Sequence, residues 1–273
     1  LAAMMVGREV ILQVEKGPAK PADVILNVED LSIMDERGVE VVRQLSMQVK
    51  GGEILGIAGV QGNGQTELVE ALTGLRRRKS GKVVLRGKEL PEMQPRQNVE
   101  AGQAHIPEDR HKHGLVLGFS IADNEVLCTY YQPPFAHGLQ RDFKAVMKNA
   151  VELVERFDIR TPSPMLPAKK LSGGNQQKAI VARELSRPIH LLVANQPTRG
   201  LDVGSIEYIH RQIVEMRDKG VAVLLVSAEL DEIMALSDRI AVMYHGQIVA
   251  TLDADKATRA ELGLLMAGAK LES

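Results

Sequence analysis

Hydrophobic and polar residues alternate in two stretches near the start of the chain, at 24–34 and 39–49. Alternation with a period of two predicts β-strands that bury one face. The residues between the two stretches, Asp35-Glu36-Arg37-Gly38, are typical of a turn. We therefore expect the strands to pair antiparallel and to form a small sheet of their own.

Continuous apolar runs follow, and they lie at 54–58, 189–194, 221–226 and 239–243. Strands buried on both faces have this pattern, which is typical of parallel sheets covered by helices. The segments between the runs show helical periodicity, as in the stripe Ile206, Ile209, Ile213 and Met216. The sequence predicts an α/β core with a mostly parallel sheet.

From about residue 95 to residue 170 the pattern changes. Apolar residues at helical spacing predict one helix there: Phe143, Val146, Met147, Ala150, Val154 and Phe157. Proline-rich breaks border this part of the chain, at 133–134 and 161–164. We interpret the segment as an inserted helical subdomain whose aromatic residues pack in its core.

A glycine-rich loop follows the run 54–58 and leads into a helix with apolar Leu68, Val69 and Leu72. This strand–loop–helix order is the setting of a phosphate-binding P-loop, whose backbone N–H groups surround phosphates. We assign nucleotide binding to Gly59, Gly62, Asn63, Gly64, Gln65, Thr66 and Glu67. The P-loop pattern requires Lys where this chain has the neutral Gln65, so the loop lacks the ammonium that reaches the β- and γ-phosphates.

A second glycine-rich motif is Leu171-Ser172-Gly173-Gly174-Asn175-Gln176-Gln177-Lys178, at the expected start of a helix. Adjacent glycines are unfavourable in a first helical turn, so they indicate that backbone N–H groups closely approach a ligand. The positive end of a helix favours an anion, and phosphate is the ligand we expect.

These motifs make the chain resemble the ATP-binding subunits of bacterial ABC importers for simple sugars and nucleosides, specifically their second, C-terminal cassette. The resemblance extends from about Val24 to Ala250, and its motifs come in the family's order: P-loop 59–66, Q-loop 107–110, signature 171–178, Walker B 191–196, Asp-loop 198–202 and switch 226–229. It implies a P-loop NTPase of the ABC-cassette fold. The nucleotide-binding domain then spans 24–252, after a linker or tail of a preceding cassette at 1–23 and before a C-terminal helical tail at 253–273.

The resemblance also shows which catalytic positions are altered. Active cassettes have Asp and Glu where this chain has Asn195 and Gln196, and His where it has Ala228. Amides cannot accept a proton as a general base does, so we expect hydrolysis at this site to fail. The implied Mg²⁺ ligands are Thr66, Glu108 and Asn195.

Nucleotide binding at this P-loop is expected to be weak for a further reason. Members of the family stack adenine on an aromatic residue upstream of the P-loop, and no aromatic residue precedes Phe119 here. Adenine would rest on Ile33 or Met34, without the ~1 kcal/mol or more that an aromatic face contributes.

Family members pair head to tail, so that each ATP lies between one P-loop and the other cassette's signature. The resemblance therefore implies that Ser172, Gly173, Gly174 and Gln176 complete the ATP and Mg²⁺ site of a second cassette, the N-terminal half of the same polypeptide. Further implied partners are transmembrane permease subunits and, indirectly, a solute-binding protein. The implied location is the cytoplasmic face of the inner membrane, with peripheral attachment.

Two other functions are alternatives to an importer cassette. A non-catalytic, nucleotide-sensing regulatory domain would not need an intact signature, which favours the first interpretation. A soluble cassette protein of translation or DNA repair is disfavoured by a net charge of −1, which also argues against nucleic acid as a partner. The solute is not encoded here, although residues 62–68 look closer to nucleoside-type members than to ribose-type ones.

Composition agrees with a globular protein, since 44% of the 273 residues are hydrophobic and 25% are charged. The single cysteine, Cys128, excludes an internal disulfide and suits a reducing cytoplasm. No apolar stretch approaches the roughly 18–20 residues that cross a bilayer. His111 and His113 lack further ligands at zinc-site spacing. Asp202 is interpreted with equal weight as a helix N-cap or as a residue of the dimer interface.

Overall fold

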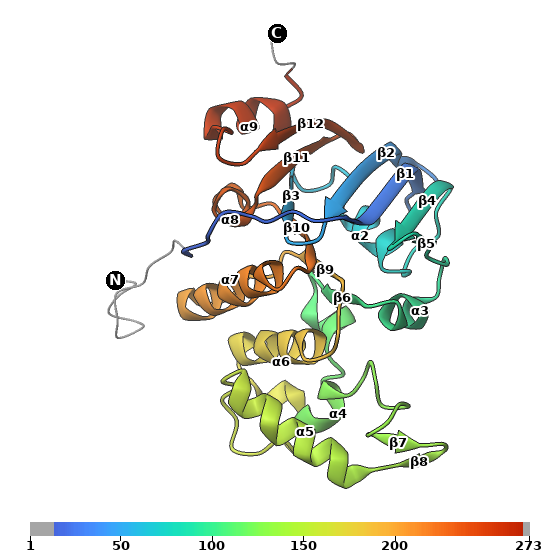
Figure 1. Ribbon diagram of the computed structural model, residues 1–273, viewed down its shortest axis with the longest axis vertical. Coiled ribbons are helices and arrows are strands. Elements are labelled where there is room, and N and C mark those ends of the chain that lie inside the picture. The colour runs from blue at the N-terminus through green and yellow to red at the C-terminus, as the bar shows by residue number, and fades with distance from the viewer. Residues whose placement is uncertain (1–13, 270–273) are drawn as a thin grey trace. The chain divides into compact units, whose positions relative to one another are not determined.

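A computed structural model describes residues 14–269 (Figure 1). The predicted tail at 1–23 and the predicted C-terminal segment at 253–273 therefore lie partly outside the described residues. The chain forms two compact units. The sheet unit contains 14–105, Ile189–Gln196 and 210–269, and the helical unit contains Ile106–Pro188 and Pro197–Ile209.

One sheet of the sheet unit is antiparallel, with strand order β2-β1-β4-β5. Its strands are β1 (Val24–Met34), β2 (Glu40–Lys50), β4 (Ser80–Leu85) and β5 (Lys88–Glu89). The pairing of β1 with β2, in which Met34 lies opposite Glu40, confirms the predicted antiparallel pair. Leu26 and Val28 are buried while Glu29 is exposed, as the alternating pattern requires.

The other large sheet has the order β12-β11-β3-β10-β9-β6. Its strands are β3 (Ile54–Ala58), β6 (Gln103–Ile106), β9 (Leu191–Asn195), β10 (Ala222–Ser227), β11 (Arg239–Tyr244) and β12 (Gln247–Asp253). Strand β10 pairs in parallel with β3 and β9, and β11 pairs in parallel with β3, whereas β11 and β12 are antiparallel. The predicted mostly parallel core is confirmed.

The start of the inserted subdomain was predicted too early. Helix α3 (Pro95–Glu100) and nearly all of β6 belong to the sheet unit, whose contacts extend to residue 105. Strand β6 was missed because it begins with the polar Gln103, which is nevertheless buried, so the strand shows no continuous apolar run. The Gln103 side chain donates a hydrogen bond to the carbonyl of Leu72 at 3.1 Å, which makes this burial possible.

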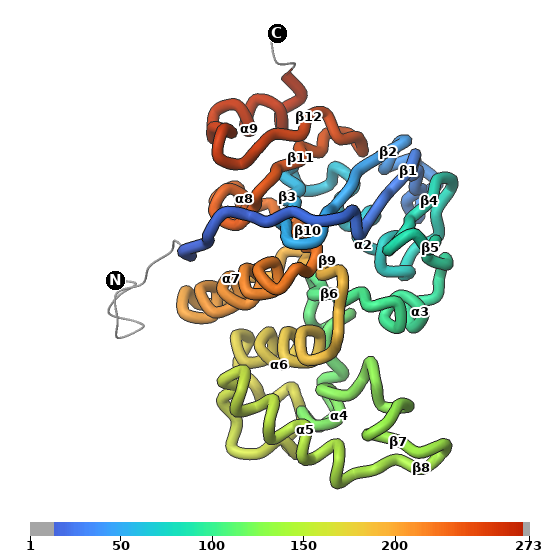
Figure 2. The backbone as a smooth tube through the Cα atoms, viewed as in Figure 1, coloured from blue at the N-terminus to red at the C-terminus, as the bar shows by residue number. Residues whose placement is uncertain are grey.

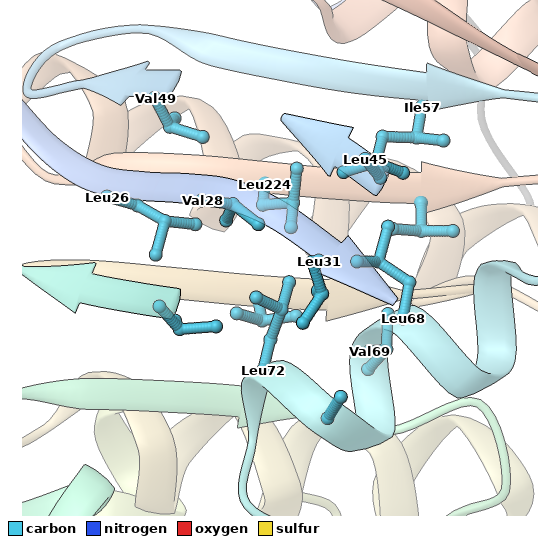
Figure 3. Packing of buried hydrophobic residues seen from close by; sticks show 14 of the residues in the cluster. Leu26, Val28, Leu31, Leu45, Val49, Ile57, Leu68, Val69, Leu72 and Leu224 are labelled. Carbon is cyan, nitrogen blue, oxygen red and sulfur yellow. The ribbon is translucent and has the colours of Figure 1, made fainter. Parts of the chain in front are cut away.

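Helix α2 (Gln65–Leu72) joins the two sheets of this unit through one hydrophobic cluster. Figure 3 shows Leu68, Val69 and Leu72 of α2 directed at side chains of β1, with Leu31 beside Leu72. The helix that follows the P-loop is therefore held against the core through its apolar face.

Further helices complete the sheet unit: α8 (Leu230–Leu236), α9 (Arg259–Met266) and the second part of α7 (Val203–Asp218). Of the predicted stripe on α7, Ile209, Ile213 and Met216 are buried and Ile206 is partly exposed. Among the residues that the structure describes, no helix is long and apolar enough to cross a membrane.

The segment expected to be a linker runs along the sheet unit (Figure 2), and its Lys16 side chain is bound to that unit. The Lys16 ammonium donates to the carbonyls of Leu236 and Ser237, where α8 ends, and lies 3.4 Å from Asp238. The guanidinium of Arg217, only 1% exposed, bridges the Gly17 carbonyl at 3.0 Å and Asp238 at 2.9 Å. Charged donors at the end of α8 suit its negative dipole end.

The helical unit contains α4 (Ile121–Glu125), α5 (Phe143–Arg156), α6 (Gly173–Leu185), the first part of α7, and the short pair β7 (Ala136–His137) and β8 (Gln140–Arg141). Its small core joins Ala122 and Val126 to Val146 and Ala150. The prediction that the aromatic residues of this segment pack in the core holds for Phe157, which is buried, but is wrong for Phe143, which is 70% exposed at the first position of α5.

Candidate nucleotide site and signature helix

The loop between β3 and α2 has the backbone of a phosphate cradle. Gly64, the residue before α2, has φ 101°, a left-handed conformation that side chains disfavour. A Cβ at this position would lie 2.4 Å from the carbonyl oxygen of Val41, so only glycine fits. The loop is also tied to the β11–β12 turn, because the N–H of Gly246 donates to the Asn63 carbonyl at 3.0 Å.

The side chain of Gln65 folds back into this loop and is 9% exposed. Its Oε1 accepts a hydrogen bond from the N–H of Asn63 at 3.1 Å, and its Nε2 donates to the carbonyl of Val60 at 3.1 Å. The neutral Gln65 Oε1 thus accepts from a backbone N–H, that of Asn63, of the kind that a P-loop offers to phosphate. The loop suits a phosphate group in shape, but the phosphate must displace Gln65 and gains no ammonium in return.

The altered catalytic residues lie at the same edge of the parallel sheet as the P-loop. Strand register places Asn195 opposite Val226, and Ser227 opposite Ala58, at the carboxyl ends of β9, β10 and β3. Gln196 follows with φ 49° and donates its N–H to the carbonyl of Val226 at 2.8 Å. The exposed Ala228 follows Ser227. The structure therefore brings together three predicted positions from distant parts of the sequence.

The proposed metal ligands suit Mg²⁺ poorly. In the sheet unit they are the hydroxyl of Thr66, at the exposed start of α2, and the carboxamide of Asn195, and neither carries a charge. Glu108 belongs to the helical unit, where its carboxylate pairs with Arg199. Mg²⁺ favours carboxylate and phosphate oxygens. Within residues 14–269 no group of three His, Cys, Asp or Glu side chains is placed to hold a metal.

Two further expectations for nucleotide binding have different outcomes. Ile33 is fully buried in the core of the sheet unit and cannot support adenine, so that assignment is wrong. Met34 remains partly exposed at the end of β1, and Glu67 is partly exposed in the first turn of α2.

In the helical unit, Ser172 caps the signature helix α6. Its side chain is exposed, and its hydroxyl accepts hydrogen bonds from the backbone N–H of Asn175 at 3.4 Å and from the Asn175 side chain at 2.9 Å. Gly173 is partly exposed. The first turn of α6 thus presents a hydroxyl and backbone N–H groups at the surface.

The next glycine has a structural reason of its own, which corrects the view that both glycines only serve a ligand. A Cβ on Gly174 would lie 2.2 Å from Oγ of Ser205 and 3.0 Å from Oδ2 of Asp202. Gln176 is also turned inward, because its Nε2 donates to the Ala168 carbonyl at 3.3 Å and its Oε1 lies 3.0 Å from Nε2 of His111. The sequence carries no signal for these contacts between distant residues.

Asp202 acts as the N-cap of α7. Its Oδ1 accepts from the N–H of Ser205 at 3.0 Å and its Oδ2 from the Ser205 hydroxyl at 2.7 Å. The hydrogen bond from the Ser205 side chain lowers the pKa of Asp202. The helix-cap interpretation is confirmed.

The sequence profile of a family described as ABC transporter matches residues 42–199. The chain belongs to the ABC transporter family.

Among curated proteins, the chain is 52% identical over 268 residues to the guanosine import ATP-binding protein NupO of Bacillus subtilis (strain 168), covering 98% of this chain and 52% of that protein. It is 49% identical over 271 residues to the nucleoside import ATP-binding protein NupA of Lactococcus lactis subsp. cremoris (strain MG1363), covering 99% of this chain and 54% of that protein. The chain thus spans about half the length of these relatives.

Solved structures show the same fold. An ATP-binding cassette of an ABC transporter, MJ1267 in its ADP conformation, matches with a TM-score of 0.69 at 20% identity, over 90% of this chain and 96% of that chain. A dimeric cassette, MJ0796 in a post-hydrolysis state with ADP and Pi, matches with a TM-score of 0.72 at 18% identity, over 84% of this chain and 99% of that chain. The predicted ABC-cassette fold, an α/β P-loop NTPase with a small antiparallel sheet, is confirmed.

Proposed function

We propose that this chain is the second, C-terminal cassette of an importer for nucleosides or simple sugars, with a degenerate nucleotide site of its own. Its signature helix completes the ATP site of a partner cassette, and it transmits closure to a membrane permease. The isolated chain then hydrolyses little or no ATP.

The observation that carries the degenerate site is the position of Gln65. Its carboxamide satisfies the Asn63 N–H and the Val60 carbonyl inside the loop, so phosphate binding breaks existing hydrogen bonds. The general base is replaced by Gln196 and the switch histidine by Ala228, at the same sheet edge. A well-placed general base alone accelerates a reaction roughly 10²–10⁴-fold, which is the scale of the loss we expect.

The partner cassette is supported by length and by a relative's assembly. The relatives NupO and NupA are about twice as long as the matched region, which leaves room for another cassette in the same polypeptide. The solved cassette MJ0796, of the same fold, is described as dimeric. A signature helix with the exposed Ser172 at its start suits a site that is completed by another cassette.

The names of the relatives support the solute class. NupO and NupA are import ATP-binding proteins for guanosine and for nucleosides, and a 42% identical protein of Haloferax volcanii is one for glucose. We therefore place nucleosides first and simple sugars second. The chain would lie at the cytoplasmic face of the membrane with permease subunits and, indirectly, a solute-binding protein.

The test uses the assembled importer in liposomes with its solute-binding protein, and the readout is solute-stimulated ATP hydrolysis. Ser172→Asp retains a good N-cap but places a negative charge against the partner's phosphate, so it should abolish hydrolysis. The matched variant Ser172→Asn also caps the helix without charge and should lose much less activity than Ser172→Asp. Gln65→Ala should change hydrolysis little.

The opposite ranking, with Gln65→Ala severe and Ser172→Asp mild while both variants assemble, would contradict the proposal. That ranking would mean that nucleotide acts at this chain's own P-loop, and it would favour a nucleotide-sensing regulatory domain. Steady hydrolysis by the isolated chain would contradict the degenerate site.

A further inference from the structure

Arg110, the last residue of the Q-loop, lies beside the first glycine of the signature helix. One nitrogen of its guanidinium is 3.2 Å, and its Cζ 3.7 Å, from the point where a Cβ of Gly173 would stand. Its Nη1 donates to the carbonyl of Arg199 at 3.2 Å. The guanidinium therefore borders the space that a side chain at position 173 would fill. All three residues belong to the helical unit.

No carboxylate neutralises Arg110 within the described part of the chain. Glu108 pairs with Arg199 instead. Asp109 caps the turn that begins at Arg110, and its Oδ1 accepts from the N–H groups of Lys112 at 3.0 Å and His111 at 2.9 Å. Those bonds lower the pKa of Asp109, which remains an anion engaged with backbone. The Nε of Arg110 is buried, with no acceptor among residues 14–269.

A guanidinium without an ion pair among the described residues therefore stands beside the positive end of a 13-residue helix. The Asp202 carboxylate near Gly174 is engaged by Ser205. The guanidinium and the positive helix end both favour an anion bound beside them. The exposed hydroxyl of Ser172 and the backbone of Gly173 lie at the same helix end. The group that satisfies all of them is a multiply charged anion with several acceptor oxygens, such as a terminal phosphate.

We propose that Arg110 is a further catalytic residue, which donates hydrogen bonds to the γ-phosphate of the ATP held by the partner cassette. This inference rests on the proposed function, because the phosphate reaches Arg110 only if the signature helix completes another cassette's site. Water attacks the γ-phosphorus, the bond to the β-phosphate oxygen breaks, and the partner cassette accepts the proton of the water.

The guanidinium stabilises the charge that develops on the equatorial oxygens during this step. Its planar set of donors suits two phosphate oxygens at once, which an ammonium does not match. A group that acts on the transition state changes kcat more than KM for ATP.

The experiment measures ATP hydrolysis by the assembled importer in liposomes with its solute-binding protein. Arg110→Gln should lower kcat at least ~10-fold, and by up to ~10³-fold, the low end of what an arginine acting on phosphoryl transfer supplies. Arg110→Lys should recover part of the loss. Lys112→Gln, in the same turn and with an exposed side chain, is the matched control and should retain the parent rate. Trapping of ADP with aluminium fluoride should fail in Arg110→Gln while ATP binding persists.

Each outcome bears on a different claim. If Arg110→Gln hydrolyses ATP at the parent rate while Ser172→Asp is inactive, the role of Arg110 is overturned and the proposed function stands. If Arg110→Gln and Ser172→Asp are both active, the proposed function and the role of Arg110 are both wrong. If Arg110→Gln and Arg110→Lys lose activity equally and also lose thermal stability or assembly, Arg110 only positions the Arg199 loop, and the catalytic assignment is wrong.

Discussion

The contact of Gly174 with the start of α7 gives a sharp prediction, because it separates packing from phosphate binding. Gly174→Ala introduces a Cβ that would lie 2.2 Å from Oγ of Ser205, about 1 Å inside normal contact. Overpacking of this kind destabilises a protein by roughly 1–3 kcal/mol. The helical preference of Ala over Gly offsets up to ~1 kcal/mol. We expect a net loss of about 1–2 kcal/mol in the free energy of unfolding.

Ser205→Gly removes the atoms that the new methyl group meets. By itself this change loses the hydrogen bond from the Ser205 hydroxyl to Asp202, worth about 1–2 kcal/mol because the acceptor is charged. In the double variant the methyl group introduced by Gly174→Ala occupies the vacated space. The double variant should therefore lose about 1–2 kcal/mol less free energy of unfolding than the two single variants lose in total.

The measurement is urea-induced unfolding of the four variants of this cycle, followed by far-ultraviolet circular dichroism. The control is Gly118→Ala in the same unit, where a Cβ would meet no atom of residues 14–269 within 4 Å. That variant should match the parent within ~0.5 kcal/mol. If Gly174→Ala is as stable as Gly118→Ala, or if the double variant is strictly additive, the packing explanation is wrong and the glycine is retained for its ligand alone.

Three further predictions concern other parts of the molecule. Gln65→Ala removes two hydrogen bonds inside the P-loop, so it should lower the free energy of unfolding by about 1–2 kcal/mol. It leaves the Asn63 N–H with only its longer bond to the Val60 carbonyl at 3.3 Å, so calorimetry should show several-fold tighter binding of pyrophosphate, and unchanged or weaker binding would contradict the competition. Lys16→Met should speed hydrogen exchange in α8, whose last carbonyls Lys16 binds, whereas Lys20→Met, an exposed side chain of the same segment, should leave exchange unchanged; equal effects of the two variants would refute the anchoring role. Burial raises the pKa of Glu125 well above 4.5, so the folded protein holds this proton more tightly than the unfolded chain does, and its contribution to stability is complete below pH 4.5 and is lost as the pH rises through the raised pKa. Glu125→Gln should therefore raise the free energy of unfolding at mildly alkaline pH relative to the parent and make no such difference below pH 4.5, and a variant with the parent's pH profile would rule this out.

The strand pattern was predictable because it depends on local periodicity. The runs that became β3, β9, β10 and β11 are apolar throughout, and a sheet covered on both faces requires this. Strand β6 was missed because its polar Gln103 is accepted only through a hydrogen bond to Leu72, 31 residues away. The binding of Lys16 was missed for the same reason, since its partners lie 220 and more residues away.

The sequence by itself determined the chemistry that is present or absent at each motif: a P-loop without its lysine, amides at positions 195 and 196, and an unaltered signature. These follow from residue type and spacing, which no packing can change. Only the tertiary structure decided what those side chains contact. It directs Gln65 into its own loop, gives Gly174 a neighbour in Ser205, and pairs no carboxylate of residues 14–269 with Arg110. Such contacts join segments far apart in the chain, and burial rather than local preference selects them.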